Sequence, residues 1–408
     1  MTTHYDTIIV GAGLSGLSCA VKCQEANISY CLIDKQPRLG GRVGSVLKDG
    51  FVLDLGFQVY NTSYSSANGL LGGSHKHFHR FRPGAAVHIN GKPRLFSDPL
   101  RDPGAILPTL RFPKASVLDF WRLLMLRLDI RGLARRQPKA TSLSTMQYLE
   151  GCGFSQSFID SFFQPFFSGV FLEQDLATSS KFFRLVFSSF NQGYAAIPNG
   201  GMQEIPRTMA RGLDPGSSLL GVSVESILPG NRLKLADGRI FTYGHLVLTG
   251  ESIQLACQLR TRYLPVCTVY YSAAHAGPFP KYIHLFPGDE LITNAAFLSS
   301  VAPGYAPSGE NLVSVSVLGD AMDTPDLELA VTERLSRYFS GTNMNFRHLH
   351  TFRSKMGTLF QKPGVSFHPK PNMPNMVFAG ELFTHASIEG AVLSGYQAFD
   401  SLQVMRDA

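Results

Sequence analysis

The sequence has 408 residues, of which 44% are hydrophobic and 16% charged, and its formal net charge is +7. This composition is typical of a globular protein of two or three domains and excludes a mainly disordered chain. The positive charge suits an anionic cofactor, an acidic substrate or an anionic membrane surface. The lysines and arginines are dispersed and no nucleic-acid-binding motif is present, so we expect no nucleic-acid partner.

Cysteine usage and hydropathy indicate where the protein acts. No C-x-x-C pair occurs among the six cysteines, which are Cys19, Cys23, Cys31, Cys152, Cys257 and Cys267. We expect them to be reduced core residues. There is no basic-then-apolar leader and no run of about 18 apolar residues, so we expect no transmembrane helix and a cytoplasmic location.

The N-terminal residues are typical of a strand, a tight turn, a helix and a second strand. Residues 5–10 (YDTIIV) predict a buried strand, and residues 11–16 (GAGLSG) predict the turn. Residues 17–26 are helical in composition, and residues 29–33 (SYCLI) predict the second strand, which ends at Asp34. This is a βαβ-type opening, whose crossover should be right-handed.

The turn matches the pattern G-x-G-x-x-G. Gly11 permits the tight turn, Gly13 lets the backbone approach a pyrophosphate, and Gly16 allows the helix to pack closely on the strand. The N-terminus of the helix then offers N–H groups and a positive dipole end to the phosphates. Asp34 follows Gly16 by 18 residues, at the place of a carboxylate that binds ribose. The pattern in this context predicts a dinucleotide site.

A second motif favours FAD over NAD. Residues 34–43 (DKQPRLGGRV) directly follow the second strand. Gly40 and Gly41 let the backbone come close to the cofactor, and the Arg42 guanidinium can pair with phosphate.

The rest of the chain alternates between strand and helix patterns. Residues 237–238 (DG) predict a hairpin turn between strands at 233–235 and 239–241, and residues 245–249 (HLVLT) predict a buried strand. Further elements are expected as helices within 116–136 and 142–190, strands of a second sheet within 263–320, a strand at 377–379 and a helix at 389–402.

These motifs, taken in order, resemble the flavin amine oxidoreductase superfamily, which includes amine oxidases, protoporphyrinogen oxidase and phytoene desaturases. Six more segments carry the resemblance, namely residues 54–58 (DLGFQ), 198–202 (PNGGM), 224–227, 246–249, 379–381 (AGE) and 387–391 (SIEGA). Two glycine-rich motifs lie near the N-terminus and two segments, residues 379–381 and 387–391, lie near the C-terminus. They are specific for this superfamily when they are found together at opposite ends of one chain.

The resemblance implies an α/β protein with a Rossmann-like, glutathione-reductase-like FAD-binding domain and an inserted α+β substrate domain. We expect the first domain to comprise residues 1–64, 191–250 and 355–408, and the second to comprise residues 65–190 and 251–354. The residues expected to contact FAD are Gly11, Gly13, Leu14, Ser15, Gly16, Asp34, Lys35, Gly40, Gly41, Arg42, Val43, Gly56, Phe57, Gln58, Val224, Gly380, Glu381, Ser387, Ile388 and Ala391.

The sequence departs from the pattern of an amine oxidase at several points. Ser387 stands where those enzymes often carry an aromatic residue of the amine cage. Val266 stands where residues 265–271 would carry a flavin-facing lysine. No cysteine lies near the final helix, so the FAD is expected to be noncovalent. Gln58, Tyr60 and His385 are candidate catalytic residues because they lie within or beside the flavin motifs.

Three further patterns leave alternatives open. Residues 150–195 contain many phenylalanines, which predict either a helical core or an apolar substrate tunnel. In residues 116–136, Arg127, Arg131 and Arg135 recur every four residues, and predict either a solvated basic face or contact with an anionic membrane. The alternating histidines of residues 74–79 would share one face of a strand, but no partner acid or cysteine lies nearby, so we expect no metal.

The sequence therefore predicts an FAD-dependent oxidoreductase that passes hydride from an apolar small molecule to a noncovalent flavin. An amine or amino-acid oxidase is one alternative. The other is a non-redox binding protein of the same fold, as in the Rab escort proteins. The residues specify neither the substrate, nor the electron acceptor, nor the oligomeric state.

Overall fold

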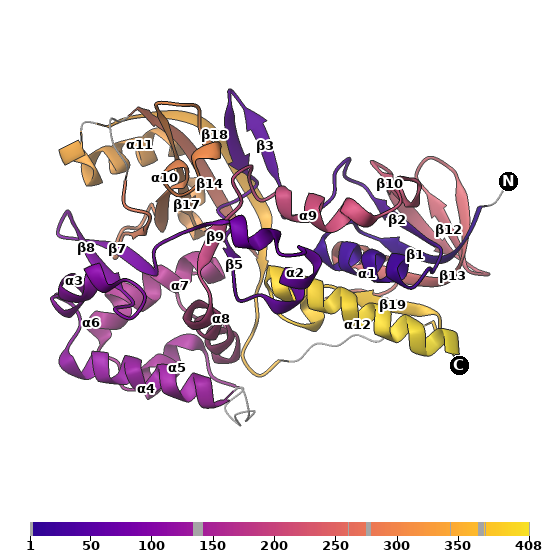
Figure 1. Ribbon diagram of the computed structural model, residues 1–408, viewed down its shortest axis with the longest axis horizontal. Helices are drawn as coiled ribbons and strands as arrows, with labels where there is room; N and C mark the ends of the chain where they lie inside the picture. The colour runs from indigo at the N-terminus through magenta and orange to yellow at the C-terminus, as the bar shows by residue number, and fades with distance from the viewer. Residues whose placement is uncertain are drawn as a thin grey trace.

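The structure of the protein is a computed structural model that describes residues 3–133, 142–259, 261–274, 279–342, 344–365, 371 and 373–407. Figure 1 shows two lobes, with both labelled termini at the outer end of one of them. The lobe that holds the termini is built on one seven-stranded sheet, and the other on a second seven-stranded sheet with a group of helices beneath it.

The first sheet contains the predicted βαβ opening. Its strands are β10 (Ser218–Leu220), β2 (Tyr30–Asp34), β1 (Thr3–Val10), β13 (Ile240–Thr249), β12 (Arg232–Leu235) and β11 (Val224–Leu228) in that spatial order, with β19 (Met376–Ala379) paired to β13. The pairs β10–β2, β2–β1, β1–β13 and β13–β19 are parallel, whereas β11, β12 and β13 are antiparallel. The predicted hairpin at residues 237–238 is confirmed, although residues 240–249 form one continuous strand.

Four helices accompany this sheet, namely α1 (Leu14–Glu25), α2 (Ser65–Leu70), α9 (Glu204–Met209) and α12 (Ile388–Asp407). Helices α1 and α12 lie side by side (Figure 1). The Ser18 hydroxyl donates to the Val392 carbonyl at 3.0 Å, and a Cβ atom at Gly395 would overlap the Ser15 carbonyl oxygen. The last helix therefore packs on the first one with almost no space between their backbones.

The second sheet runs in the order β18 (Asn345–Leu359), β14 (Tyr263–Ala274), β17 (Glu310–Val317), β16 (Asn294–Phe297), β15 (Ile283–Leu285), β7 (Gly84–Ile89) and β8 (Lys92–Ser97). Helices α10 (Leu298–Val301) and α11 (Leu327–Tyr338) accompany it. The described residues also form two small sheets. One is a hairpin of β3 (Ser45–Lys48) and β4 (Phe51–Asp54), and the other joins β5 (Tyr60–Asn61) and β6 (His79–Arg80) to the more distant β9 (Ala195–Ile197).

The helical part of the second lobe comprises α3 (Ile106–Leu110), α4 (Val117–Leu133), α5 (Thr145–Gly151), α6 (Gln156–Phe158), α7 (Gln164–Phe171) and α8 (Ser180–Gln192). Its core is built from phenylalanines. The buried ones are Phe96, Phe112, Phe154, Phe158, Phe163, Phe167, Phe171, Phe182 and Phe183. Some of their rings meet edge to face, as Phe154 and Phe163 do with centroids 4.9 Å apart, and others are stacked or tilted, as Phe163 and Phe167 are stacked. The helical-core interpretation of residues 150–195 is confirmed.

Residues 74–79 do not form the strand that their alternating histidines predicted. Ser74–His77 is a short 3-10 helix, and only His79 lies in a strand. The three side chains therefore do not line one strand face. The structure holds no cluster of potential metal ligands within the ranges described above.

A pair of histidines is buried in the second sheet. His88 Nε2 lies 3.0 Å from His284 Nδ1, and the rings of Phe286 and Phe339 pack against them. Burial lowers the pKa of His88 to about 4 and that of His284 to about 3. Both imidazoles are therefore neutral at physiological pH.

This pair is expected to make the protein less stable in acid. Because each folded pKa lies below the unfolded value near 6.5, the unfolded chain binds more protons as the pH falls below 6.5. Each histidine should lower the free energy of unfolding of the protein by about 2 kcal/mol between pH 7 and pH 5. Urea unfolding at the two pH values should show a smaller loss for His88→Gln than for the wild type. An equal loss in both proteins would contradict this assignment.

Candidate active site

The turn between β1 and α1 has the geometry of a phosphate-binding loop. Gly11 has a φ of 106°, and a Cβ atom there would overlap the Thr249 hydroxyl. Helix α1 begins directly after Gly13, and no side chain caps its N-terminus. A Cβ at Gly13 would meet no heavy atom within 4 Å. The turn thus presents uncapped helical N–H groups, including those of Leu14 and Ser15, beside open space that suits an anion.

Asp34 fixes this turn to the end of β2. Its carboxylate accepts hydrogen bonds from the Ala12 amide at 2.6 Å and the Gln36 amide at 2.7 Å. The Val222 amide donates to the Asp34 carbonyl at 3.0 Å, which brings the segment before Val224 to the same edge of the sheet. The ribose contact of Asp34 and the adenine contact of Val224 stay predictions. Asp34 ends β2 and Val224 begins β11, and the bond from Val222 brings these two strand ends close together.

The second glycine motif lies directly on the first. The Gly40 amide donates to the Ala12 carbonyl at 2.8 Å, and a Cβ at Gly41 would lie 3.1 Å from the Gly13 Cα. Gly41 also has a φ of 58°, so a larger residue would be both strained and crowded. Val43 closes the loop, since its amide donates to the Gly40 carbonyl at 3.0 Å.

Arg38 holds this loop together, a role that the sequence reasoning missed. Its guanidinium donates to the Gly41 carbonyl at 2.6 Å and contacts the Gln203 side chain at 3.4 Å. Burial lowers the pKa of Arg38, although a guanidinium stays charged. An arginine two residues before the glycine pair was the available signal.

The N-terminal and C-terminal motifs meet in an ion pair. Arg42 Nη2 lies 2.6 Å from Glu381 Oε1, and the Glu381 side chain is only 8% exposed whereas that of Arg42 is 43% exposed. The Arg42 guanidinium also lies 5.5 Å from the centroid of the Tyr263 ring. Burial, and after it Glu381, raises the pKa of Tyr263 to about 12. The ion pair brings together Arg42 and Glu381, which the sequence motifs assigned separately to the cofactor, and Tyr263 is an unpredicted neighbour.

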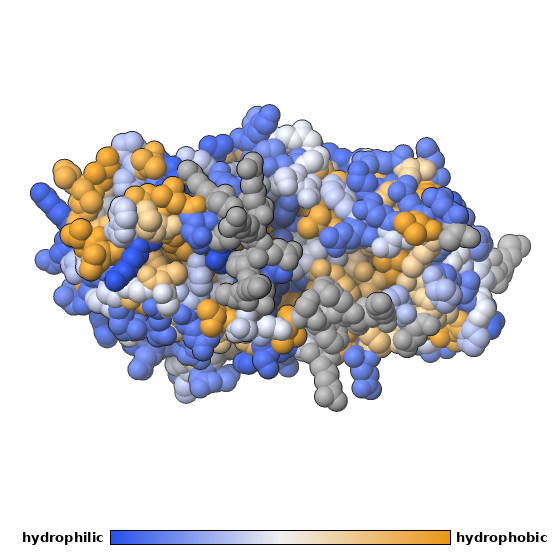
Figure 2. Space-filling model, turned by 90° about the horizontal axis from the view of Figure 1, so that it is seen from below, coloured by the Kyte–Doolittle hydropathy of each residue, from blue (hydrophilic) through white to orange (hydrophobic). Residues whose placement is uncertain are grey.

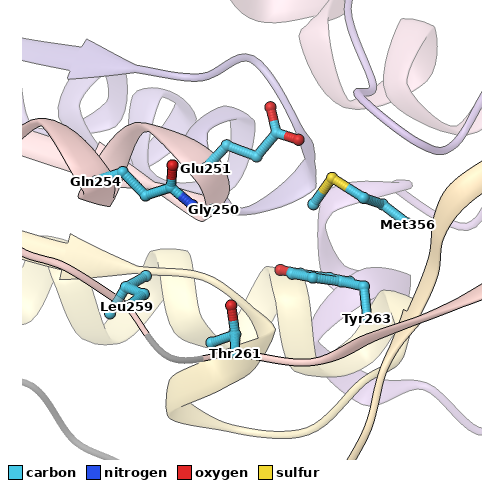
Figure 3. A pocket seen from close by; sticks show the side chains of 7 residues that line it. All are labelled: Gly250, Glu251, Gln254, Leu259, Thr261, Tyr263 and Met356. Atoms are coloured by element: carbon cyan, nitrogen blue, oxygen red, sulfur yellow. The ribbon is translucent and has the colours of Figure 1, made fainter.

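A pocket of about 360 Å³ opens beside this ion pair (Figure 3). Figure 3 shows Glu251, Met356 and Tyr263 around one opening. The lining residues are Gly250, Glu251, Gln254, Leu259, Thr261, Tyr263 and Met356. Glu251 also pairs with Lys35 at 2.6 Å, so an exposed ion pair joins the pocket to the residue after Asp34. None of the seven lining residues was predicted.

The segment predicted to line the flavin is anchored through Asp54. Its carboxylate accepts hydrogen bonds from the Met202 amide at 2.9 Å and the Tyr305 hydroxyl at 2.7 Å. Burial raises the pKa of Asp54 to about 6. These bonds tie residues 54–58 to residues 198–202, so two of the weaker motifs support each other in space.

Two buried side-chain oxygens, one on Gln58 and one on Thr268, lie in or beside residues 54–58. Gln58 Nε2 donates to the Arg42 carbonyl at 3.1 Å, while its Oε1 has no hydrogen-bond partner among the described residues. Thr268 Oγ1 on β14 is likewise unpaired among them, and it lies 3.9 Å from where a Cβ of Gly56 would stand. Unpaired buried oxygens are costly, so these two atoms fit a site completed by a polar ligand. Thr268 lies two residues after Val266 and was not predicted.

The segment before α12 is organised around Ser387. Its hydroxyl lies 2.9 Å from His385 Nδ1 and accepts a hydrogen bond from the Gly390 amide at 3.0 Å, and the Ala391 amide donates to the Ser387 carbonyl. Burial lowers the pKa of His385, so its imidazole is neutral at physiological pH. Ser387 therefore caps the first turn of α12, which starts at Ile388, and orients His385.

Tyr60 lies in a different environment from the other catalytic candidates. Its side chain is fully buried, and its hydroxyl donates to Asn68 Oδ1 at 2.6 Å. The rings of Tyr64 and Phe78 pack edge-on against it. The hydroxyl is thus engaged within the core, and the catalytic role of Tyr60 stays a prediction.

Comparison with known proteins agrees with this geometry. Residues 14–400 match the family described as flavin containing amine oxidoreductase. The chain belongs to that family. The predictions of the superfamily, of a Rossmann-like α/β fold, of a flavin cofactor and of the oxidoreductase class are thereby confirmed.

Solved members of the flavin amine oxidoreductase fold superpose over nearly the whole chain. An oxidoreductase from Methanosarcina mazei has a TM-score of 0.74 at 16% identity and covers 97% of this chain and 99% of its own. A putrescine oxidase has a TM-score of 0.72 at 16% identity, and the superposition covers 99% of this chain and 100% of the oxidase. Identities this low support the fold alone.

Curated relatives match over short segments. A 4,4'-diapolycopene oxygenase of Methylomonas is 47% identical over 49 residues, which is 12% of this chain and 10% of that protein. A probable flavin-containing monoamine oxidase A of Dictyostelium discoideum is 34% identical over 77 residues, which is 19% of this chain and 14% of that protein. The matched segments thus span well under a fifth of those relatives.

Proposed function

We propose that this protein binds FAD noncovalently and oxidises or desaturates an apolar organic substrate. The observation that carries the proposal is the meeting of three segments distant in sequence, in which the turn at Gly13 contacts Gly41 and the next residue, Arg42, pairs with Glu381. When bound, FAD supplies the hydride acceptor, and the protein holds, orients and shields the reactants.

The residues of the site divide into two groups by the part of FAD that they would hold. The uncapped N-terminus of α1 and Arg42 would bind the pyrophosphate, and Asp34 would bind the ribose. The unpaired oxygens of Gln58 and Thr268 offer acceptors to N–H groups at the flavin end. His385, neutral and oriented by Ser387, would accept or hold a proton there.

An apolar substrate is supported by what lies beside His385. Its ring is 6.4 Å from that of Phe182, and Ala386 packs against the phenylalanine-rich core. The relatives named above act, by their names, on a diapolycopene and on monoamines. The aromatic surroundings favour the first kind of substrate.

We also propose that the protein acts in the cytoplasm, with a peripheral membrane contact through residues 116–136. All six cysteines are free and four of them are buried, which suits a reducing compartment. Among the described helices, none is both long and apolar enough to cross a bilayer.

The visible spectrum of the purified protein tests the cofactor and its attachment. We expect the bands of oxidised flavin, and FAD as the chromophore released on denaturation. Anaerobic bleaching by apolar polyenes and not by a panel of amines would support the substrate class. Bleaching by amines with release of peroxide in air would support an amine oxidase. A protein that stays colourless in excess FAD would contradict the oxidoreductase proposal and favour the non-redox alternative.

A further inference from the structure

The outer side of the helical lobe exposes an apolar surface. Helix α4 presents six large apolar side chains to solvent, namely Val117, Leu118, Trp121, Leu124, Met125 and Leu128. Their spacing of three and four residues places them on one face of the helix. Trp121 is the single tryptophan of the sequence, and its side chain is 57% exposed.

The neighbouring segment extends this surface. Leu100 before α3, and Ile106, Leu107 and Leu110 on α3, are exposed as well. Figure 2 shows hydrophobic side chains gathered at the left of the molecule, where α3 and α4 lie in Figure 1. We call this set of residues on α3 and α4, together with Leu100, the α3–α4 surface. Apolar surfaces of this extent on a folded protein mark interaction sites.

The exposed charges on β8 and in the loop between α3 and α4 are positive. Arg111 and Lys114 are exposed in the loop between the two helices, and Lys92 and Arg94 are exposed on β8, which packs against α3. All of residues 92–128 are described, and their only carboxylates are buried or half-buried: Asp98 pairs with Arg127, Asp102 with Arg82, and Asp119 with Arg122. The exposed charges of this stretch are therefore all positive. The next carboxylate along the chain, Asp129 near the C-terminal end of α4, is 51% exposed and pairs with Arg184 at 3.1 Å.

The basic face that the arginine spacing predicted is not the outward face of α4. Arg127 is mostly buried and pairs with Asp98 at 3.0 Å. The side chain of Arg131 and the whole of Arg135 lie outside the described residues. The outward face is apolar instead, and the positive charges come from its flanks.

We propose that the α3–α4 surface docks on a membrane of anionic phospholipids, with α4 lying in the plane of the interface. An exposed apolar helix face, a tryptophan on it and flanking cations with no free carboxylate are the features that such a helix uses. The inference gives the peripheral contact proposed above a surface and a lipid class. It is independent of the redox chemistry, so the vesicle test and the flavin spectrum can fail separately.

A second copy of the chain fits this surface less well. A two-fold contact centred on the loop between α3 and α4 would bring Arg111 and Lys114 toward their own symmetry mates. The exposed carboxylate of Asp129 lies at the other end of α4 and already pairs with Arg184. A lipid surface supplies both the apolar phase and the negative charge.

Trp121 is a built-in probe of the docking. The flavin-loaded protein is titrated with vesicles of phosphatidylcholine alone or mixed with phosphatidylglycerol. We expect its tryptophan emission to shift to the blue and to be quenched by brominated acyl chains only with the mixed vesicles. Binding should weaken with added salt. Unchanged emission with both kinds of vesicle would overturn the proposal, as would equal binding to both.

Matched variants separate docking from folding. Leu118→Glu is expected to lower the vesicle partition coefficient roughly tenfold, because one leucine can no longer be buried. Leu329→Glu is the control, since Leu329 on α11 is 58% exposed and Leu118 is 60% exposed. The control should bind as the wild type does, and both should keep the wild-type flavin content. Equal loss in both variants would overturn the assignment of the surface. So would a wild-type dimer that Leu118→Glu dissociates while vesicles have no effect.

Discussion

Replacing Gly16 by alanine is expected to lower the free energy of unfolding by about 2–3 kcal/mol and to leave the purified protein largely without flavin. Gly16 lies in the first turn of α1, and a Cβ atom there would overlap the Gly11 carbonyl oxygen. Relieving the overlap requires α1 to move away from β1. That movement would also displace the helical N–H groups that we propose to bind the pyrophosphate.

Gly151→Ala is the matched control for this substitution. Gly151 also lies in a helix, but a Cβ atom there would meet nothing within 4 Å. Alanine should therefore raise stability there by up to ~1 kcal/mol, because glycine is unfavourable within helices. Thermal unfolding and the ratio of flavin to protein absorbance measure both effects. If the two variants matched in both quantities, close packing at Gly16 would not be what the flavin site requires.

Replacing Arg42 by methionine is expected to weaken FAD binding at least tenfold and to lower the free energy of unfolding by roughly 2 kcal/mol. The substitution leaves the buried Glu381 carboxylate without its cation. The loss should be smaller than for a fully buried pair, because water reaches the Arg42 side chain. Titration of the apoprotein with FAD and urea unfolding measure the two quantities.

A double-mutant cycle with Glu381→Gln isolates the pair. If the ion pair matters, the double variant should be more stable than the sum of the two single losses predicts. Lys234→Met is the surface control, because Lys234 pairs with Glu225 at 2.8 Å between two exposed side chains. It should cost no more than about 1 kcal/mol and leave FAD affinity unchanged. A tenfold loss of affinity in the control would mean that net charge, and not the pair, governs binding.

The parts of the fold that could be predicted from the sequence are those encoded by near neighbours. Residues 5–16 predict a strand, a turn and a helix because period, glycine spacing and the following acid all act over a few positions. The arginine spacing in residues 116–136 was misleading for the opposite reason. Arg127 turns toward Asp98, which is 29 positions away in the loop after β8, and no local pattern encodes that choice.

The same limit applies within the candidate site. Gly13, Gly41 and Glu381 could be singled out as candidate cofactor residues because their motifs occur together and in order along one chain, and their contacts with FAD stay predictions. Tyr263 and Thr268 could not, because each matters only through a partner brought close by folding. Their signal in the sequence is an unremarkable strand. The His88–His284 pair joins residues 196 positions apart and has no sequence signal at all.

The arrangement of the first lobe also sets an order of events during synthesis of the chain. Strand β1 emerges first, but its neighbour β13 follows some 230 residues later, and the next strand, β19, and helix α12 come from the last part of the described chain. A nascent chain on the ribosome therefore carries the phosphate-binding turn without the Glu381 and Ser387 segments. Completion of the proposed cofactor site must wait until these segments have been synthesised. In cells short of flavin, the protein would then lack the stabilisation that the ligand provides.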